Sequence, residues 1–303
     1  GSRGITGVLP SIQEMIAADI LMVCDSCMVA PGVPTITMGL RGLVHLTCSL
    51  RGAHHDLHSG THGGRAPNPA QGMAHLVASL HRADGSVAIA GFYDGVALPG
   101  REERESASRI PFDPVSYERV TGVPPLGGEK HFSPVERVGF RPCLEVNGMH
   151  SGYAGAGVKT IIPAMATTKL SARLVPGQDP ERCLAAIIAH LESNTPPGLK
   201  LEIDEKGNSG GAFSLSVKSR VIGRARKALR ALSGVEPVLS WDGASVPVVP
   251  LLGKFARAEP LLVGFSTEMD NTHAVNESFS LSQFRQGFLY AGILLSDLAK
   301  GGE

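Results

Sequence analysis

The chain has 303 residues, of which 43% are hydrophobic and 18% charged, and it carries 28 basic and 28 acidic side chains. That length suits two domains, or one domain interrupted by another, and allows a sizeable hydrophobic core. A formal net charge of zero gives no electrostatic reason to expect a nucleic acid or an anionic membrane as a partner. The longest apolar runs fall short of a membrane span, and no secretory signal opens the sequence. We therefore expect no membrane contact and a cytoplasmic location.

The first strong signal is an apolar run over residues 20–24 that stops abruptly on Asp25. The run predicts a buried β-strand, with a helix-like stretch over residues 10–18 before it and the turn-forming segment 30–34 after it. Open α/β sheets bind ligands at the carboxyl ends of their strands, so Asp25 is a candidate ligand for a cation. The alternative is that Asp25 only caps or turns the chain.

The middle of the chain, residues 42–209, predicts the β-α-β-β-α-β order of a ferredoxin-like domain. Its six elements are expected over residues 43–50, 67–82, 143–146, 168–174, 180–191 and 199–203. Residues 84–140 are rich in glycine, proline and charge, which predicts a long surface insert without a core of its own. The glycine-rich segment 207–211 predicts the hinge that leaves this domain.

After the hinge, the α/β pattern of the first forty residues returns. A basic amphipathic helix, two strands and a closing helix are expected over residues 216–232, 238–241, 261–265 and 281–299. The simplest architecture is therefore an α/β domain formed by residues 1–41 and 210–303, interrupted by an inserted α+β domain over residues 42–209.

A polar loop, residues 269–278, lies between a predicted strand and the last predicted helix, and it contains His273. This position would bring His273 to the same sheet edge as Asp25. Neutral imidazole and carboxylate are the usual protein ligands of Zn²⁺, and Mn²⁺ also accepts them. The alternative is a loop histidine that forms only local hydrogen bonds.

Two features suit an anionic group of a substrate. The glycine-rich turn 242–247 follows a predicted strand, and its backbone N–H groups could cradle an anion, although a simple tight turn fits the same residues. Arg173 lies on a predicted strand of the inserted domain. Its guanidinium suits a terminal carboxylate if it faces the space between the domains, and otherwise it forms a surface ion pair. Thr160, one strand earlier, could face the same space.

Two clusters invite a metal or redox interpretation. His54, Asp56 and His58 alternate along the chain, which would place them on one face of a strand as metal ligands; alternatively, this loop offers His58 to a substrate. Cys24 and Cys27 form a C-x-x-C pair, which would suit a redox or zinc site. The sequence has no second such pair and no disulfide pattern among its five cysteines. We therefore expect Cys24 and Cys27 to be buried and to act as small hydrophobic residues, in a protein of a reducing compartment.

Four segments together resemble the di-metal peptidase family that includes aminoacylases, carboxypeptidase G and carnosinase-like dipeptidases. They are Asp56-Leu57-His58-Ser59-Gly60, Lys159-Thr160-Ile161-Ile162-Pro163, residues 173–180, and His273 with Asn276-Glu277. Their order and their spread over nearly the whole chain carry the resemblance. It implies the family fold, which is a zinc-peptidase α/β domain interrupted by a ferredoxin-like lid that is used for dimerisation. We expect this fold class here, with the α/β domain incomplete on its N-terminal side.

The resemblance implies two divalent metal ions, Zn²⁺ or Mn²⁺, at the active centre. Asp25 corresponds to a ligand of one ion and His273 to a ligand of the other. Family members carry further ligands and a general-base glutamate before the segment equivalent to residues 1–2. We therefore expect this chain to resemble the C-terminal two-thirds of such an enzyme and to be nearly inactive alone.

The resemblance also implies how a substrate would be held. His58 corresponds to a lid histidine that reaches the partner subunit's active site and polarises the scissile carbonyl. Arg173 and Thr160 correspond to groups that hold the substrate's terminal carboxylate. Ser245 lies in the matching substrate loop, where Ala244 replaces a glycine that is usual in the family.

The function that the resemblance implies is metal-dependent hydrolysis of an amide bond in a dipeptide or an N-acyl amino acid, by a homodimer joined through the lid. Two alternatives stay open. One is a non-catalytic dimerisation or interaction module derived from the same fold. The other is an oxidoreductase that uses Cys24 and Cys27.

Overall fold

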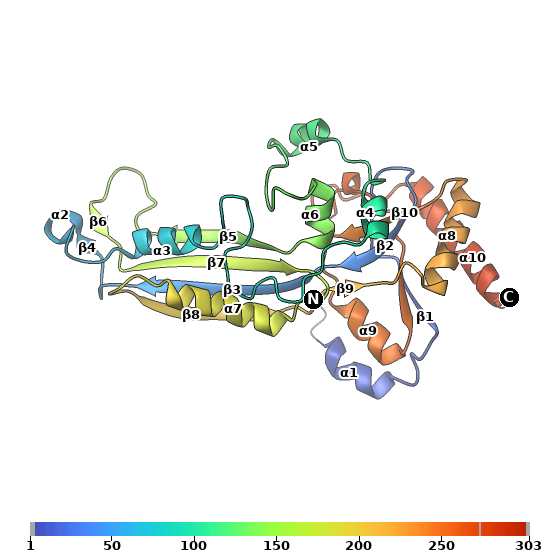
Figure 1. The fold of residues 1–303 in the computed structure, drawn as a ribbon, viewed down its shortest axis with the longest axis horizontal. Helices are drawn as coiled ribbons and strands as arrows, with labels where there is room; N and C mark the ends of the chain where they lie inside the picture. The colour runs from blue at the N-terminus through green and yellow to red at the C-terminus, as the bar shows by residue number, and fades with distance from the viewer. Residues whose placement is uncertain (1–3, 273, 301–303) are drawn as a thin grey trace.

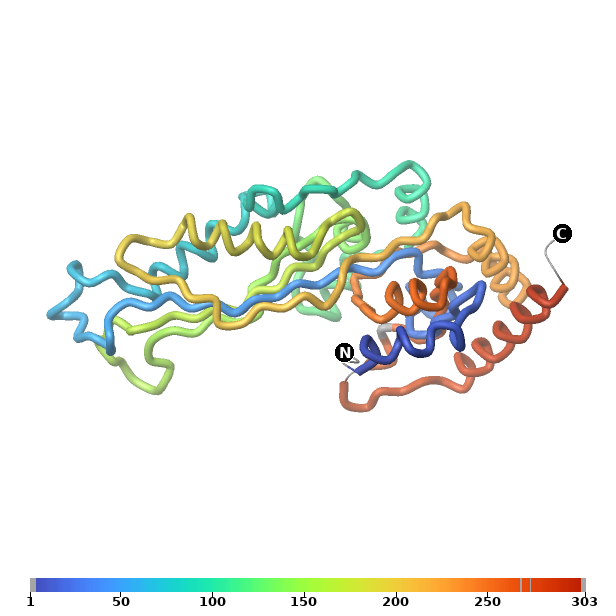
Figure 2. The backbone as a smooth tube through the Cα atoms, turned by 90° about the horizontal axis from the view of Figure 1, so that it is seen from below, coloured from blue at the N-terminus to red at the C-terminus, as the bar shows by residue number. Residues whose placement is uncertain are grey.

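The structure is a computed structural model, and it describes residues 4–272 and 274–300. Figure 1 shows an elongated molecule in which the first and last parts of the chain form an α/β domain and the middle part forms a long second domain. β3 (Gly42–Arg51) leads from one domain into the other, and β8 (Lys200–Asn208) runs beside it on the way back (Figure 2). The expected fold class, an α/β domain interrupted by a lid, is confirmed.

The α/β domain is built on a mixed sheet in the order β1-β11-β2-β10, with β9 paired to β2. These strands are β1 (Ile20–Val23), β2 (Thr35–Leu40), β9 (Phe213–Ser214), β10 (Val238–Asp242) and β11 (Glu259–Leu262). The expected buried strand before Asp25 is instead an edge strand, and Met22 on it is 39% exposed. The prediction of burial was wrong because an apolar run indicates a strand but not the number of its neighbours.

The helices of this domain are α1 (Ile5–Ile12), α8 (Arg220–Ser233), α9 (Val248–Ala256) and α10 (Leu281–Ala299). α8 packs against β2, β11 and α10, and α9 packs against β1, β11 and α1. α1 begins and ends earlier than the predicted helix because Leu9 is fully buried and anchors it, whereas Met15 is 83% exposed. In the part of the chain that is described, no helix combines the length and the apolarity needed to cross a bilayer.

α10 is apolar on two sides. Tyr290 and Leu294 are buried in the core of the α/β domain. On the other side, Leu281, Phe284 and Phe288 are 87%, 64% and 73% exposed. Large exposed apolar side chains along one side of a helix are typical of a protein-contact surface, so this outer side of α10 is suited to further protein contacts.

The lid domain has the predicted ferredoxin-like order. Its antiparallel sheet runs β5-β7-β3-β8, with β5 (Cys143–Ser151) and β7 (Met165–Leu174) beside the two connecting strands. α3 (Pro69–Ala78) and α7 (Pro180–Ser193) pack against this sheet. Asn68 and Asp179 cap the starts of these helices and a proline follows each cap, which is the sequence pattern of a helix N-terminus. A second hydrophobic core lies between the sheet and the helices.

The tip of the lid is formed by a small hairpin and a short helix. β4 (Leu57–His58) pairs with β6 (Ile161–Ile162), and α2 (Ser59–His62) follows β4. Figure 1 shows this tip at the end of the molecule that is remote from the α/β domain. A 3₁₀ turn, η1 (Glu268–Asp270), belongs to the opposite end.

The insert over residues 84–140 has no core of its own, but it is less superficial than expected. It carries α4 (Arg101–Ala107), α5 (Pro114–Thr121) and α6 (Pro134–Phe140). Ile89 and Phe92 are part of the lid core, whereas Ala107 and Phe140 are part of the α/β core. The insert therefore bridges the two domains, and only α5, which has no buried residue, stands away from both.

Candidate active site

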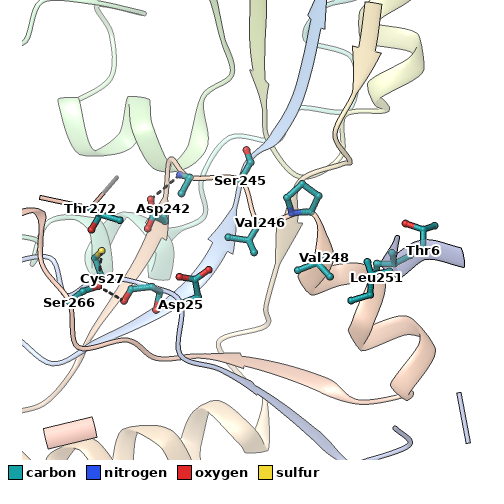
Figure 3. A pocket seen from close by; sticks show the side chains of 14 residues that line it. Thr6, Asp25, Cys27, Asp242, Ser245, Val246, Val248, Leu251, Ser266 and Thr272 are labelled. Carbon is teal, nitrogen blue, oxygen red and sulfur yellow. Dashed lines mark hydrogen bonds between the residues drawn. The ribbon is translucent and has the colours of Figure 1, made fainter. Parts of the chain in front are cut away.

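A cavity of about 580 Å³ opens at the carboxyl ends of β1, β10 and β11. Its polar lining comes from the segments that follow these strands, namely Asp25, Ser26, Cys27, Asp242, Ser245, Ser266 and Thr272. Residues of α1 and α9 add a further wall, on which Val248 and Leu251 are apolar and Thr6 carries a hydroxyl (Figure 3). This is the edge of the sheet where the sequence predicts a ligand site.

Asp25 is exposed, and its carboxylate points toward the loop that carries Asp242 and Val246 (Figure 3). Within residues 4–272 and 274–300, its oxygens make no hydrogen bond and no ion pair, so they are free to meet a cation. The alternative of a capping or turn residue has no supporting bond in the described structure. Asp242 provides a second carboxylate in the same cavity.

The backbone that presents Asp25 is fixed against the end of β11. Ser266 donates its hydroxyl to the carbonyl of Ser26 at 3.1 Å, and the Cys27 Sγ lies 3.2 Å from the Ser266 Oγ. A Cβ atom placed on Gly264 would fall 1.6 Å from the carbonyl oxygen of Ser26, so only glycine permits this approach. The position of Asp25 is therefore set by close packing of neighbouring backbone and not by its own side chain.

The substrate loop, residues 242–247, lies at the same cavity and meets Arg173. The Asp242 carboxylate accepts a hydrogen bond from the Ala244 N–H at 2.9 Å, which holds the loop in a tight turn. The Arg173 Nη1 donates to the Ser245 Oγ at 2.9 Å. The structure thus brings together Arg173, Ala244 and Ser245 with the cavity that Asp25 lines.

His58 and Thr160 lie elsewhere, at the tip of the lid. The Ser59 N–H donates to the Thr160 carbonyl at 3.0 Å, and the His58 Nδ1 accepts a hydrogen bond from the Gly60 N–H at 3.1 Å. β7 has ten residues and so spans roughly 30 Å; the tip adjoins its first residue and Arg173 lies near its last. The expectation that Thr160 and Arg173 face the same space is therefore wrong within one chain.

The polar loop that contains His273 also reaches the cavity, since Thr272 lines it. His273 itself lies outside the described residues, so its expected pairing with Asp25 stays a prediction. The start of the loop is tied down at Asp270, whose carboxylate accepts hydrogen bonds from the Thr267 N–H and the Gln283 side chain, both at 2.7 Å.

The described residues contain no group of three or more histidine, cysteine, aspartate or glutamate side chains placed to hold a metal ion. The metal interpretation of His54, Asp56 and His58 is therefore not supported, and Asp56 instead accepts a hydrogen bond from the Ala164 N–H at 2.9 Å. The donor set at the cavity does fit a divalent ion in part, because Asp25 offers a free carboxylate and oxygen donors suit Zn²⁺ or Mn²⁺.

The C-x-x-C pair does not look like a redox site. Partial desolvation by neighbouring atoms raises the pKa of the Cys24 thiol, whereas reactive cysteines have lowered pKa values. The Cys27 Sγ interacts with the Ser266 Oγ. Cys24 is nevertheless exposed and Cys27 is only partly buried, so the expectation that both cysteines are buried was wrong; both follow an edge strand.

Sequence reasoning missed two residues near the cavity, Asp242 and Arg41. Asp242 ends β10 much as Asp25 follows β1, so the same strand-end rule would have found it. Arg41 lies directly after the apolar strand β2 and is only 8% exposed. An arginine at a buried strand end was the available signal.

The fold and the cavity define a class of protein: an α/β domain with an inserted ferredoxin-like lid and a cavity at the carboxyl edge of its sheet. The family model described as the M20 peptidase dimerisation domain matches residues 38–199, which is more than half of the 303 residues. The chain therefore belongs to the M20 peptidase family.

Individual relatives agree with this family. The chain is 24% identical over 296 residues to the Beta-Ala-His dipeptidase of Rattus norvegicus, an alignment that covers 93% of this chain and 58% of the rat protein. Its fold is similar to that of the di-peptidase Dug1p from Saccharomyces cerevisiae, with a TM-score of 0.81, 24% identity, and coverage of 100% of this chain and 64% of that one. It is also similar to the metallo-carboxypeptidase Sso-CP2 from Sulfolobus solfataricus, with a TM-score of 0.82, 24% identity, and coverage of 96% and 66%. The chain thus spans about three-fifths of these proteins.

Proposed function

We propose that this chain contributes to a metal-dependent hydrolase that cleaves the amide bond of dipeptides or N-acyl amino acids. The observation that carries the proposal is the hydrogen bond between Arg173 and Ser245, at the rim of the cavity into which Asp25 presents a free carboxylate. One cavity thus combines an anion-binding group with a cation-binding group. A short substrate with a free carboxylate and an amide bond matches that polarity.

Arg173 would hold the carboxylate end of the substrate. Arg173 is a residue of β7 in the lid. Within residues 4–272 and 274–300, its guanidinium forms no ion pair. A fixed guanidinium fork binds a carboxylate through two parallel hydrogen bonds. Ser245 orients the fork from the other domain, so the carboxylate would be bound where lid and α/β domain meet.

Asp25, together with His273, would hold divalent metal ions at the other end. When bound, such ions supply a water of lowered pKa and polarise the amide carbonyl. The residues of this chain would fix the substrate so that its amide bond lies between Arg173 and Asp25. Such positioning speeds the reaction, because a substrate that is already bound in the right orientation has lost the translational and rotational entropy that the reaction would otherwise cost.

We also propose that His58 and Thr160 act in a partner subunit. They lie roughly 30 Å from Arg173 along the lid, too far to serve the cavity of their own chain. The match to a peptidase dimerisation domain covers the segment that carries both residues. In a homodimer joined through the lid, His58 would donate a hydrogen bond to the oxyanion that develops on the scissile carbonyl.

We propose that the ligand set is completed by residues beyond those described. A Zn²⁺ site normally takes three or four protein ligands, and the described cavity offers Asp25 and Asp242. β1 has a free edge and α10 has an exposed apolar side, and a further α/β segment of the relatives' kind would pack against one or both. The 303 residues alone would then bind metal weakly and hydrolyse little.

We further propose a cytoplasmic location. All five cysteines are free thiols, and cytosolic proteins keep their thiols reduced. Fractionation of cells with an antibody to the chain tests this, and recovery from an oxidising compartment would argue against it.

The test combines metal analysis with an assay. Glycylglycine and N-acetylglycine hydrolysis would be measured with Mn²⁺ or Zn²⁺, for these 303 residues alone and for the same residues joined to the upstream portion of a relative. Activity that appears only in the joined protein, and that Arg173→Met removes, supports the proposal. Two tightly bound ions on the 303 residues alone would refute the incomplete ligand set. Absence of hydrolysis in both proteins would favour a non-catalytic dimerisation or interaction module.

A further inference from the structure

Arg41 lies at the junction of the two domains, between the end of β2 and the start of β3. Its side chain is buried and reaches the insert. The Nη2 donates to the carbonyl oxygens of Arg137 and Arg141, the latter at 2.8 Å, and these carbonyls lie at the C-terminal end of α6. A cation at this end of a helix also interacts favourably with the helix dipole. Arg41 therefore holds the end of α6 in place.

The backbone of the same residue holds the substrate loop. The Arg41 N–H donates to the Ala244 carbonyl at 2.9 Å, one residue before Ser245. On its other side, the loop touches α6: a Cβ atom placed on Gly243 would fall 2.9 Å from the Val138 Cγ1. The Phe140 ring packs 4.9 Å, centroid to centroid, from the ring of Trp241, just before the loop. The loop is thus confined between Arg41 and the helix that Arg41 holds.

Arg41 also places a second positive charge near Arg173. Burial lowers the pKa of Arg41, and the charge of Arg173 lowers it further, while Cys143 and Asp242 act in the opposite direction. Arg41 Nε is buried without a hydrogen-bond partner within the described residues. In the described part of the chain, neither guanidinium forms an ion pair with a carboxylate. Two neighbouring positive charges raise the local potential, which favours an anion beside them.

We propose that Arg41 is a positioning residue for the carboxylate end of the site: it clamps α6 and the substrate loop so that Ser245 stays in hydrogen-bond reach of Arg173. This inference rests on the proposed function, because it presupposes that Arg173 holds a substrate carboxylate. It assigns the insert a part in substrate recognition, through α6. A residue that only stabilised the fold would not distinguish substrates with and without a carboxylate.

The experiment compares two probes, glycylglycine and glycylglycinamide, which differ in the terminal carboxylate. Binding of each is measured by calorimetry on the full chain for wild type, Arg41→Met, Arg41→Lys and Arg173→Met. Arg41→Met should weaken glycylglycine binding by roughly tenfold and leave glycylglycinamide binding unchanged. Arg41→Lys should recover part of the loss, because it keeps the charge but not the fork that spans two carbonyls.

Arg104→Met is the matched control, because Arg104 also donates to a carbonyl of the insert, that of Pro99 at 3.1 Å, but does not reach the loop. Arg104→Met should leave the binding of both probes unchanged. If Arg41→Met does not fold, Gly243→Ala tests the same clamp: the added methyl would push the loop off Val138 and should also weaken glycylglycine alone.

Two outcomes overturn the inference. In one, Arg173→Met loses the preference for glycylglycine while Arg41→Met and Gly243→Ala keep it, so that only the role of Arg41 fails. In the other, both probes weaken equally in Arg41→Met, which is the mark of a purely structural residue. If Arg173→Met keeps the preference, or wild type shows none, the proposed function fails and this inference fails with it.

Discussion

Arg173 and Ser245 are 72 residues apart in the chain and belong to different domains, yet the Arg173 Nη1 donates to the Ser245 Oγ at 2.9 Å. This bond joins the lid to the cavity at the carboxyl edge of the α/β sheet. Because Arg173 has no carboxylate partner in an ion pair within the described residues, its charge is available to a ligand. A first group of predictions concerns this cavity and a second concerns the stability of the fold.

Removing the guanidinium should weaken recognition of a free carboxylate. Arg173→Met is expected to weaken the binding of a dipeptide roughly tenfold to a hundredfold, since a hydrogen bond to a charged group is lost. Ser245→Ala should have a smaller effect in the same direction, because it only frees the guanidinium to move. Calorimetry with glycylglycine measures both. Equal binding by wild type and Arg173→Met would contradict the assignment.

Replacing Asp25 should lower metal affinity. Asp25→Asn removes the charge and one strong oxygen donor, so Zn²⁺ or Mn²⁺ should bind at least about tenfold more weakly. The matched control is Asp56→Asn, whose carboxylate accepts a backbone hydrogen bond at the remote tip of the lid. A metal titration followed by calorimetry compares the variants. An affinity lowered only by the Asp56 change would place the ion at the wrong end of the molecule.

Subunit mixing should reveal whether His58 works in trans. Mixing an Asp25→Asn dimer with a His58→Ala dimer, in the active protein, would restore one intact site in each mixed dimer, or about a quarter of wild-type activity. An Asp25→Asn and Arg173→Met mixture is the control: both changes damage the same cavity of a subunit, so no site is restored. Recovery in the control, or none in the first mixture, would argue against a shared active site.

The insert should depend on a buried ion pair. Arg141 and Glu129 form a bidentate pair with side-chain exposures of only 10% and 12%, and the guanidinium stacks 4.5 Å from the Phe132 ring centroid. Glu129→Ala would leave a buried charge without its partner and should lower the free energy of unfolding by about 3 kcal/mol. Denaturant unfolding of Glu129→Ala measures this.

The exposed pair of Arg101 and Glu105, at 90% and 52% exposure, provides the comparison. Glu105→Ala should change the free energy of unfolding by less than about 0.5 kcal/mol. Similar losses for both variants would show that burial does not set the strength of these ion pairs.

Cys48 should be stable as a thiol up to high pH. Burial raises its pKa from 9.0 to about 11, with a further increase from nearby Asp204. The folded state therefore holds this proton more tightly than the unfolded state, so the stabilisation is complete below about pH 9 and is lost as pH rises toward 11. Alkylation with iodoacetamide should modify exposed Cys24 before Cys48. Early modification of Cys48 in folded protein would contradict this.

Much of the lid could be predicted from its sequence because its strands are long and alternate. β3 buries every second residue over its first half, and this period indicates a strand with one face on a core. The start of α7 at Pro180 is indicated by the local sequence, because Asp179 caps the helix and a proline follows it. The pairing order then follows from the β-α-β-β-α-β connection.

The site could be predicted only in part, because local patterns do not encode distance. Arg173 was a candidate from its residue type and Ser245 from the resemblance of its loop, but nothing in the sequence says that they touch. Thr160 seemed to be a neighbour of Arg173 in the same way, yet β7 separates the two along its length. Arg41 was overlooked because its partners are backbone carbonyls of the insert. Every residue has a backbone carbonyl, so the sequence does not indicate which ones Arg41 contacts.

The most direct test of the cavity as a metal-dependent centre is a crystal structure of the protein grown with Zn²⁺, with the ions located by anomalous scattering. The account predicts an ion about 2.0–2.2 Å from a carboxylate oxygen of Asp25, with the imidazole of His273 facing the same cavity. Zinc bound elsewhere, with Asp25 and His273 directed to different sides of the α/β domain, would contradict it.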